Sequence, residues 1–187
     1  MRPLSLAIEG LTSFREPQEI DFSEFDLFVI TGPTGAGKSS ILDAMTFALY
    51  GRVARVNAHE LRDLISHGSA DMRVRLDFEV DGAHYRVARR MGRTRHDVSL
   101  ERVVDGASTA ELERGGVQAV NDRLEEIVGL DFSAFTKAVL LPQGEFHAFL
   151  KGDKAERRRI LTRLLDLSRY ERAGQAARRE ASRLDLI

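Results

Sequence analysis

The sequence contains no cysteine, which excludes disulfides and thiolate metal sites and agrees with a reducing cytoplasm. It also lacks long apolar runs. None approaches the roughly 18 residues that a membrane span needs, and the start, MRPLSLAIEG, has no apolar signal core. An excess of either charge is missing as well, because 28 Lys and Arg residues stand against 29 Asp and Glu residues. The composition therefore predicts a soluble, cytoplasmic protein without a membrane partner, in which any contact with nucleic acid is local.

Alternation of apolar and polar residues predicts a β-rich first half. Segments 4–11 and 18–26 alternate and are expected to pair as a hairpin, and segments 73–80 and 83–90 flank the turn signal Asp81-Gly82. A third strand of this second group is expected over 96–104. Residues 27–30, LFVI, are apolar on both faces, which is typical of a buried central strand.

Helical spacing predicts three main helices and one short one. The first spans 38–50 with Gly51 as its stop, another spans 117–129, and a short helix is expected around 59–66. From Asp153 onward a narrow, Ala-rich apolar stripe predicts a helix roughly 50 Å long that suits a two-helix seam better than a globular core. With 187 residues, one packed domain over 1–150 and the beginning of a coiled-coil helix over 151–187 are expected.

The segment ITGPTGAGKSS, residues 30–40, matches the phosphate-loop pattern G-x-x-x-x-G-K-[ST]. Its glycines allow backbone N–H groups to surround an anion at the N-terminus of the following helix. Lys38 is expected to reach the β- and γ-phosphates, and the Ser39 hydroxyl to hold Mg²⁺. The predicted nucleotide-binding residues are Gly32, Pro33, Thr34, Gly35, Ala36, Gly37, Lys38, Ser39 and Ser40.

Hydrolysis needs an acidic residue at the end of a second apolar strand and a group that orients water. Neither Asp77, in the middle of an alternating strand, nor Asp131, after a helix end, fits the first role. Gln143, in LLPQGEF, could bind Mg²⁺ and water through its amide, although a plain turn fits the local sequence better. The segment ERGGVQ has Arg114 where an ATP-binding-cassette signature has Ser, and it is interpreted as a loop. The hydrolytic site is therefore predicted to be incomplete in this chain.

Three segments together, 28–51, 74–90 and 135–171, resemble the N-terminal part of the SbcC family. These proteins are ATPase subunits of bacterial DNA double-strand-end nucleases, in the SMC-like branch of the ATP-binding-cassette ATPases. The resemblance implies an α/β P-loop NTPase of SMC-like head type. It would comprise an N-terminal lobe with a mixed or antiparallel sheet, followed by the start of a long coiled-coil helix.

The resemblance also implies a split ATPase head, in which a C-terminal half supplies the signature, the second acidic motif and a His switch. Residues 32–40 would bind ATP, Lys38 and Gln143 would be catalytic, and Ser39 and Gln143 would ligate Mg²⁺. The implied partners are that C-terminal half, a second copy of the head, an SbcD-type nuclease and double-stranded DNA ends. ATP-driven dimerisation and hydrolysis would control DNA-end processing in repair and recombination, and this chain alone would be inactive.

Several points stay open from the sequence alone. The basic runs Arg86, Arg89, Arg90, Arg93, Arg95 and Lys154, Arg157, Arg158, Arg159 could contact DNA phosphates or simply be solvated. Relatives in other kingdoms often carry an Arg in the turn after the first strand, whereas Thr12 and Ser13 stand there and Arg15 follows. A small guanylate-type nucleotide kinase, or a non-hydrolytic, nucleotide-gated dimerisation module, are the alternative functions.

Overall fold

The computed structural model describes residues 1–104, 108–114 and 116–140, together with the single positions 153, 158, 174 and 178. The chain divides into two compact units, Met1–Val128 and Gly129–Ile187. Gln143 and the predicted long helix after Asp153 lie outside the described residues. The boundary at 150/151 therefore stays a prediction.

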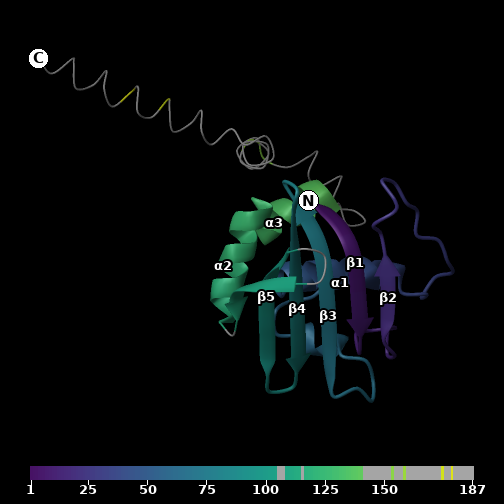
Figure 1. Ribbon diagram of the computed structural model, residues 1–187. Helices are drawn as coiled ribbons and strands as arrows, with labels where there is room; N and C mark the ends of the chain where they lie inside the picture. The colour runs from purple at the N-terminus through teal and green to yellow at the C-terminus, as the bar shows by residue number, and fades with distance from the viewer. Residues whose placement is uncertain are drawn as a thin grey trace, which may run out of the picture. The chain divides into compact units, whose positions relative to one another are not determined.

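The first unit is built on a six-stranded sheet in the order β2-β1-β3-β4-β5-β6 (Figure 1). Every neighbouring pair is antiparallel. The strands span Arg2–Glu9 (β1), Gln18–Asp21 (β2), Asp71–Val80 (β3), Ala83–Gly92 (β4), His96–Val104 (β5) and Ser108–Arg114 (β6). Both predicted hairpins and the strand over 96–104 are confirmed, and β6 is an additional edge strand.

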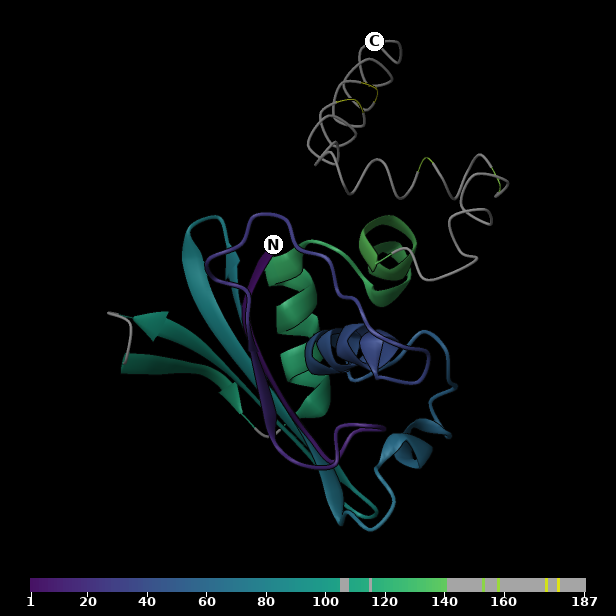
Figure 2. The same cartoon turned by 90° about the vertical axis from the view of Figure 1, so that its right-hand side faces the viewer.

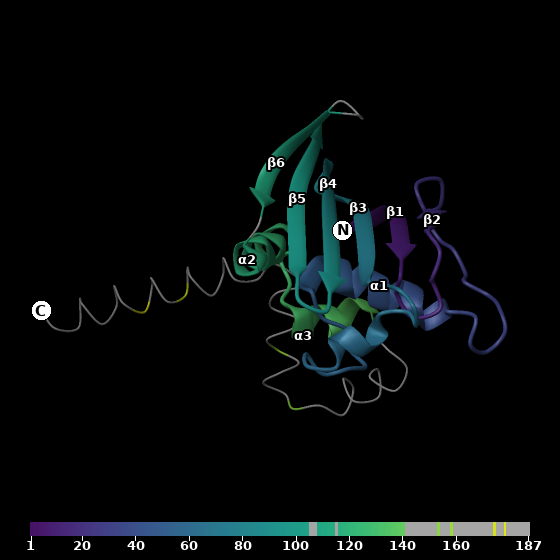
Figure 3. The same cartoon turned by 90° about the horizontal axis from the view of Figure 1, so that it is seen from below.

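Two helices cover one face of this sheet (Figure 2). Helix α1, Lys38–Tyr50, packs against β3 and β4, and α2, Val117–Val128, packs against β5, β6 and α1 (Figure 3). Alternate strand residues face them and form the core; those buried completely include Leu6, Leu76, Phe78, Val87 and Leu100. A 3₁₀ turn, Leu61–Leu64, occupies the region of the predicted short helix.

Helix α1 begins after one glycine and ends before another, as predicted. Gly37 precedes the helix with φ 88°, and Gly51 follows it with φ 62° and donates its N–H to the Phe47 carbonyl at 2.8 Å. Between these ends, almost every residue from Ser40 to Tyr50 is buried. The phosphate-loop helix is therefore held in the core from Ser40 onward, whereas its first residues, Lys38 and Ser39, are not buried.

Residues 27–30 are not part of the sheet, and the prediction of a buried central strand was wrong. Leu27 and Val29 are 88% and 81% exposed, while Phe28 is 40% exposed and lies against Phe22 with ring centroids 4.8 Å apart. An apolar run is buried only where neighbouring strands cover it. Within the described residues, no strand pairs with this segment.

The described part of the second unit begins with a short helix, α3, Phe132–Phe135. Asp131 caps it by accepting a hydrogen bond from the Ala134 N–H at 2.7 Å. A π-helical turn, Thr136–Leu140, continues it. None of the helices that the structure describes is long and apolar enough to cross a membrane.

Candidate nucleotide-binding site

The phosphate loop is an exposed, glycine-shaped turn that leads into α1. Gly32, Gly35 and Gly37 all have positive φ, at 153°, 86° and 88°. A Cβ added at Gly35 would meet no atom within 4 Å, so the loop borders open space. The first N–H groups of an α-helix have no partner within it, and here they lie where the loop ends. This geometry suits an anion at the positive end of the helix dipole.

Lys38 folds back over the loop. Its Nζ donates to the carbonyl oxygens of Gly32 and Pro33 at 2.8 and 2.7 Å. These carbonyls stand in for anionic oxygens, and exchanging them for phosphate oxygens would replace neutral acceptors by charged ones. Ser39 is exposed beside Lys38. The predicted ammonium and hydroxyl groups thus both belong to the first turn of α1.

Gly37 is also a site of close approach. A Cβ there would lie 2.4 Å from Ser13 Oγ and 3.1 Å from the ring of Phe14. The turn after β1 is therefore packed against the last residue of the phosphate loop. Sequence reasoning placed Thr12 and Ser13 in this turn without detecting that contact, because the two segments lie far apart in the chain.

The carboxylate of α1 that lies nearest to the phosphate loop in sequence, Asp43, already pairs with an arginine. Asp43 is buried and accepts from Arg55 Nε at 2.5 Å. Burial raises the pKa of Asp43, partly offset by the Arg55 charge and hydrogen bond. No group of three or more His, Cys, Asp or Glu residues that could hold a metal occurs within the described part of the chain. Mg²⁺ at a phosphate loop takes most of its ligands from phosphate and water, so an exposed Ser39 hydroxyl fits a contributing ligand.

The five arginines of the first basic run have different environments. Arg89 is only 2% exposed and donates to Ala48 O, Leu49 O and Asn121 Oδ1. It belongs to the core and is excluded as a DNA contact. Arg86 pairs with Asp77, and Arg90 with Asp71.

Arg93 and Arg95, by contrast, lie on the turn between β4 and β5, and Arg93 is exposed. They border a hollow of about 720 Å³, which the loop His67–Ala70 also lines. The second basic run lies outside the described residues, except that Arg158 is exposed.

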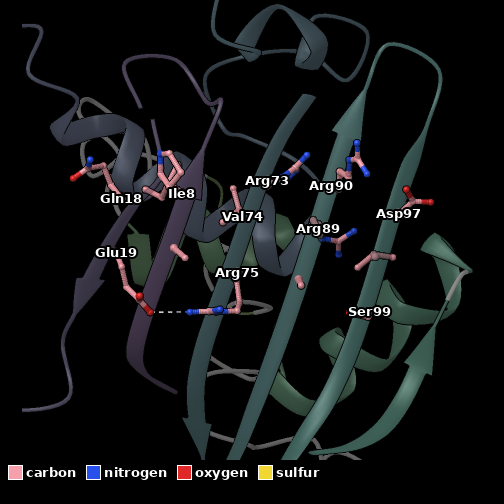
Figure 4. A pocket seen from close by; sticks show the side chains of 14 residues that line it. Ile8, Gln18, Glu19, Arg73, Val74, Arg75, Arg89, Arg90, Asp97 and Ser99 are labelled. Atoms are coloured by element: carbon pink, nitrogen blue, oxygen red, sulfur yellow. Dashed lines mark hydrogen bonds and ion pairs between the residues drawn. The ribbon is translucent and has the colours of Figure 1, made fainter. Parts of the chain in front are cut away.

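A second hollow, of about 760 Å³, lies on the sheet face away from the helices (Figure 4). Its floor consists of the small side chains Ala7, Ala88 and Ser99. Arg75 lies between Ala7 and Ala88 in the sheet and reaches Glu19 at 2.7 Å, as the dashed line in Figure 4 marks. Because α1 covers the opposite face, this hollow is not part of the phosphate loop.

Comparisons with known proteins show what the chain is similar to. An AAA domain family matches residues 5–183. The chain is 44% identical over 173 residues to the SbcC subunit of the nuclease SbcCD from Deinococcus radiodurans, covering 91% of this chain and 19% of that protein. It is 43% identical over 178 residues to a probable DNA double-strand break repair Rad50 ATPase of Aquifex aeolicus, covering 95% and 18%.

Among solved structures, an SMC head domain from Thermotoga maritima has a TM-score of 0.47 and 28% sequence identity, covering 66% of this chain and 42% of that one. The chain spans about a fifth of the length of the two curated relatives.

Proposed function

The chain belongs to the AAA domain family, and we propose that it is the ATP-binding half of a split ATPase head. Membership of this family implies nucleotide binding. The nucleotide that we propose is ATP, bound together with Mg²⁺. The loop from Gly32 to Ser40 holds the phosphates, and Lys38 exchanges the Gly32 and Pro33 carbonyls for phosphate oxygens. Ser39 provides one Mg²⁺ ligand, and bound Mg²⁺ offsets phosphate charge. Gln143 remains the proposed second ligand and water-orienting group, in a segment outside the described residues.

The observation that carries the split-head proposal is the exposed apolar segment directly before the phosphate loop. Leu27, Phe28 and Val29 expose 88%, 40% and 81% of their surface. Contiguous exposed apolar side chains mark surfaces that another polypeptide covers. A neighbouring strand would cover these side chains and also form hydrogen bonds with the unpaired backbone N–H and C=O groups of the segment. We assign that neighbour to a C-terminal half of the same head, for which relatives about five times as long have ample chain.

The names of the relatives supply the biological setting of the proposal. They are the SbcC subunit of the nuclease SbcCD and a probable DNA double-strand break repair Rad50 ATPase. The proposed cycle is that ATP binding joins two heads, and that hydrolysis releases them. This cycle controls how a partner nuclease of SbcD type processes DNA double-strand ends in the cytoplasm. The globular part over 1–150 and the coiled-coil beginning over 151–187 remain the proposed domain division.

Association with the C-terminal half tests the assignment of the apolar segment. The chain and a C-terminal segment of the same protein are co-purified, and the variant Leu27→Lys/Val29→Lys is compared with Val104→Lys. Val104 is an apolar residue 42% exposed on β5. The double variant is expected to lose the complex and Val104→Lys to keep it. Retention of the complex by both would contradict the proposal.

DNA contact is proposed for the β4–β5 turn. Replacing Arg93 and Arg95 together by Ala should weaken binding of double-stranded DNA similarly for all sequences. The slope of the logarithm of the binding constant against the logarithm of the salt concentration should decrease in magnitude by about 2. Arg73→Ala is the matched control, because Arg73 is already paired with Asp71 and Glu9. An equal loss in the control would show that the turn has no special role.

A further inference from the structure

Thr12 has an unusual backbone conformation. Its φ is 50°, in the left-handed region that a β-branched residue seldom enters. Among the described residues, the one other non-glycine with positive φ is Asp81. Asp81 is part of the Asp-Gly hairpin turn between β3 and β4, where this conformation is ordinary. Thr12 is the second residue of a tight turn in which Leu11 and Phe14 exchange backbone hydrogen bonds at 2.9 and 3.2 Å. Glycine or asparagine usually occupies such a position, so a β-branched residue there carries a cost that other contacts must offset.

Two backbone contacts tie Thr12 to the segment that follows the 3₁₀ turn. Its N–H donates to Leu64 O at 2.7 Å, and its carbonyl accepts from Ser66 Oγ at 2.8 Å. Ser66 also donates its N–H to Gly10 O at 2.8 Å. The segment 64–66 therefore holds the turn after β1 through both backbone polar groups of Thr12. The hydroxyl of Thr12 is left for another partner.

The hydroxyl points the other way, to the phosphate-loop helix. Thr12 Oγ1 donates to Ser40 Oγ at 2.7 Å, and Ser40 is buried. Ser40 follows the proposed Mg²⁺ ligand Ser39 directly. The same turn places Ser13 against Gly37, one residue before α1 begins. The costly conformation of Thr12 thus brings two consecutive residues onto the first turn of α1.

The geometry points to Thr12 as a positioning residue for the nucleotide site. Its hydroxyl fixes Ser40, and with it the first-turn N–H groups and the Ser39 hydroxyl that receive phosphate and metal. This inference rests on the proposed nucleotide binding and goes beyond it. A phosphate loop binds more tightly when it is held rigid before its ligand arrives. The Thr12 hydroxyl, on a turn distant in sequence, provides part of that rigidity.

Titration of the full 187-residue chain with ATP and Mg²⁺ in a calorimeter tests this role. Thr12→Val keeps the shape and removes the hydroxyl, and its affinity should fall about fivefold, the worth of one neutral hydrogen bond. Thr12→Ser keeps the hydroxyl and should bind normally. Thr12→Gly relieves the backbone conformation without restoring the hydroxyl, so it should bind as weakly as Thr12→Val while folding at least as well.

Two further variants distinguish positioning from a general loss of stability. Thr46→Val is the control, because Thr46 is buried on the same helix and its hydroxyl donates to Leu42 O and Asp43 O. It should alter stability without altering the affinity for ATP. Ser40→Ala removes the acceptor, and if both groups act through one hydrogen bond, Thr12→Val should add little to its effect.

The outcomes separate this inference from the proposed function. Normal ATP binding by Thr12→Val, or strictly additive losses with Ser40→Ala, would overturn the inference alone. Failure of the unmodified chain to bind ATP would overturn the proposed function and the inference with it. Weak binding by Thr12→Val and Thr12→Gly, with rescue by Thr12→Ser, would support both.

Discussion

Replacing Arg89 by Met is expected to destabilise the chain strongly. Arg89 lies on β4 with its side chain in the core, where it donates to two carbonyl groups in the last turn of α1 and to Asn121 on α2. The last carbonyls of a helix have no partner within it, and their dipoles favour a cation. Arg89 therefore joins the sheet to both helices through groups that the helices cannot satisfy alone.

The magnitude follows from two opposing contributions. Hydrogen bonds from a charged donor are worth about 2 kcal/mol each, so the three bonds together contribute about 6 kcal/mol. Burial lowers the pKa of Arg89 to about 10. This lowering corresponds to a desolvation cost of about 3 kcal/mol, which Met avoids. The expected net loss is about 3 kcal/mol.

Denaturant unfolding of Arg89→Met and Arg90→Met measures this difference. Arg90 is the adjacent residue, its side chain is 54% exposed on the opposite face, and it pairs with Asp71. Because Arg90 is exposed and Asp71 keeps Arg73 as a partner at 2.8 Å, losing this pair should cost little; exposed ion pairs are generally worth about 1 kcal/mol at most. Equal losses in the two variants, or no loss in Arg89→Met, would refute the reasoning that α1 and α2 depend on this buried cation.

Three other substitutions test separate parts of the structure. Gly37→Ala forces a Cβ to within 2.4 Å of a hydroxyl oxygen at a φ of 88°, so it should abolish ATP binding and lower the melting temperature. Lys38→Met should abolish ATP binding with little effect on melting, because Lys38 donates only to two carbonyls of its own loop among the hydrogen bonds described. Burial, helped by the Arg89 charge, lowers the pKa of His96, so the unfolded chain takes up a proton more readily and stability should fall as the pH drops below about 6.5. His96→Gln should flatten that pH dependence, whereas His59→Gln, at a side chain 79% exposed, should leave it unchanged.

Local patterns were sufficient to predict much of the first unit. The Asp81-Gly82 turn between alternating segments gave the β3–β4 hairpin, and the pattern from Gly37 to Gly51 gave α1 with its correct ends. These features depend on residues close together in the sequence. The Lys38 and Ser39 side chains followed from the same motif, because the loop and the helix N-terminus are contiguous.

The missed features depend on contacts between distant residues. Alternation placed Arg89 on the face opposite Arg86 and Arg90, but the groups that pair with it lie 32 to 41 residues away. Residues 27–30 have the pattern of a central strand, and the structure leaves them exposed because no strand in its described part covers them. Thr12 lies in a turn that the sequence predicts, yet its bond to Ser40 spans 28 positions.

ATP turnover is the measurement that tests the central claim most directly. Hydrolysis is measured for the chain alone, for a C-terminal segment of the same protein alone, and for the two mixed, at saturating ATP and Mg²⁺. The account predicts that the chain binds ATP without turnover and that the mixture hydrolyses it. Substantial hydrolysis by the chain alone would contradict the account, because the residues that complete the site would then lie within it.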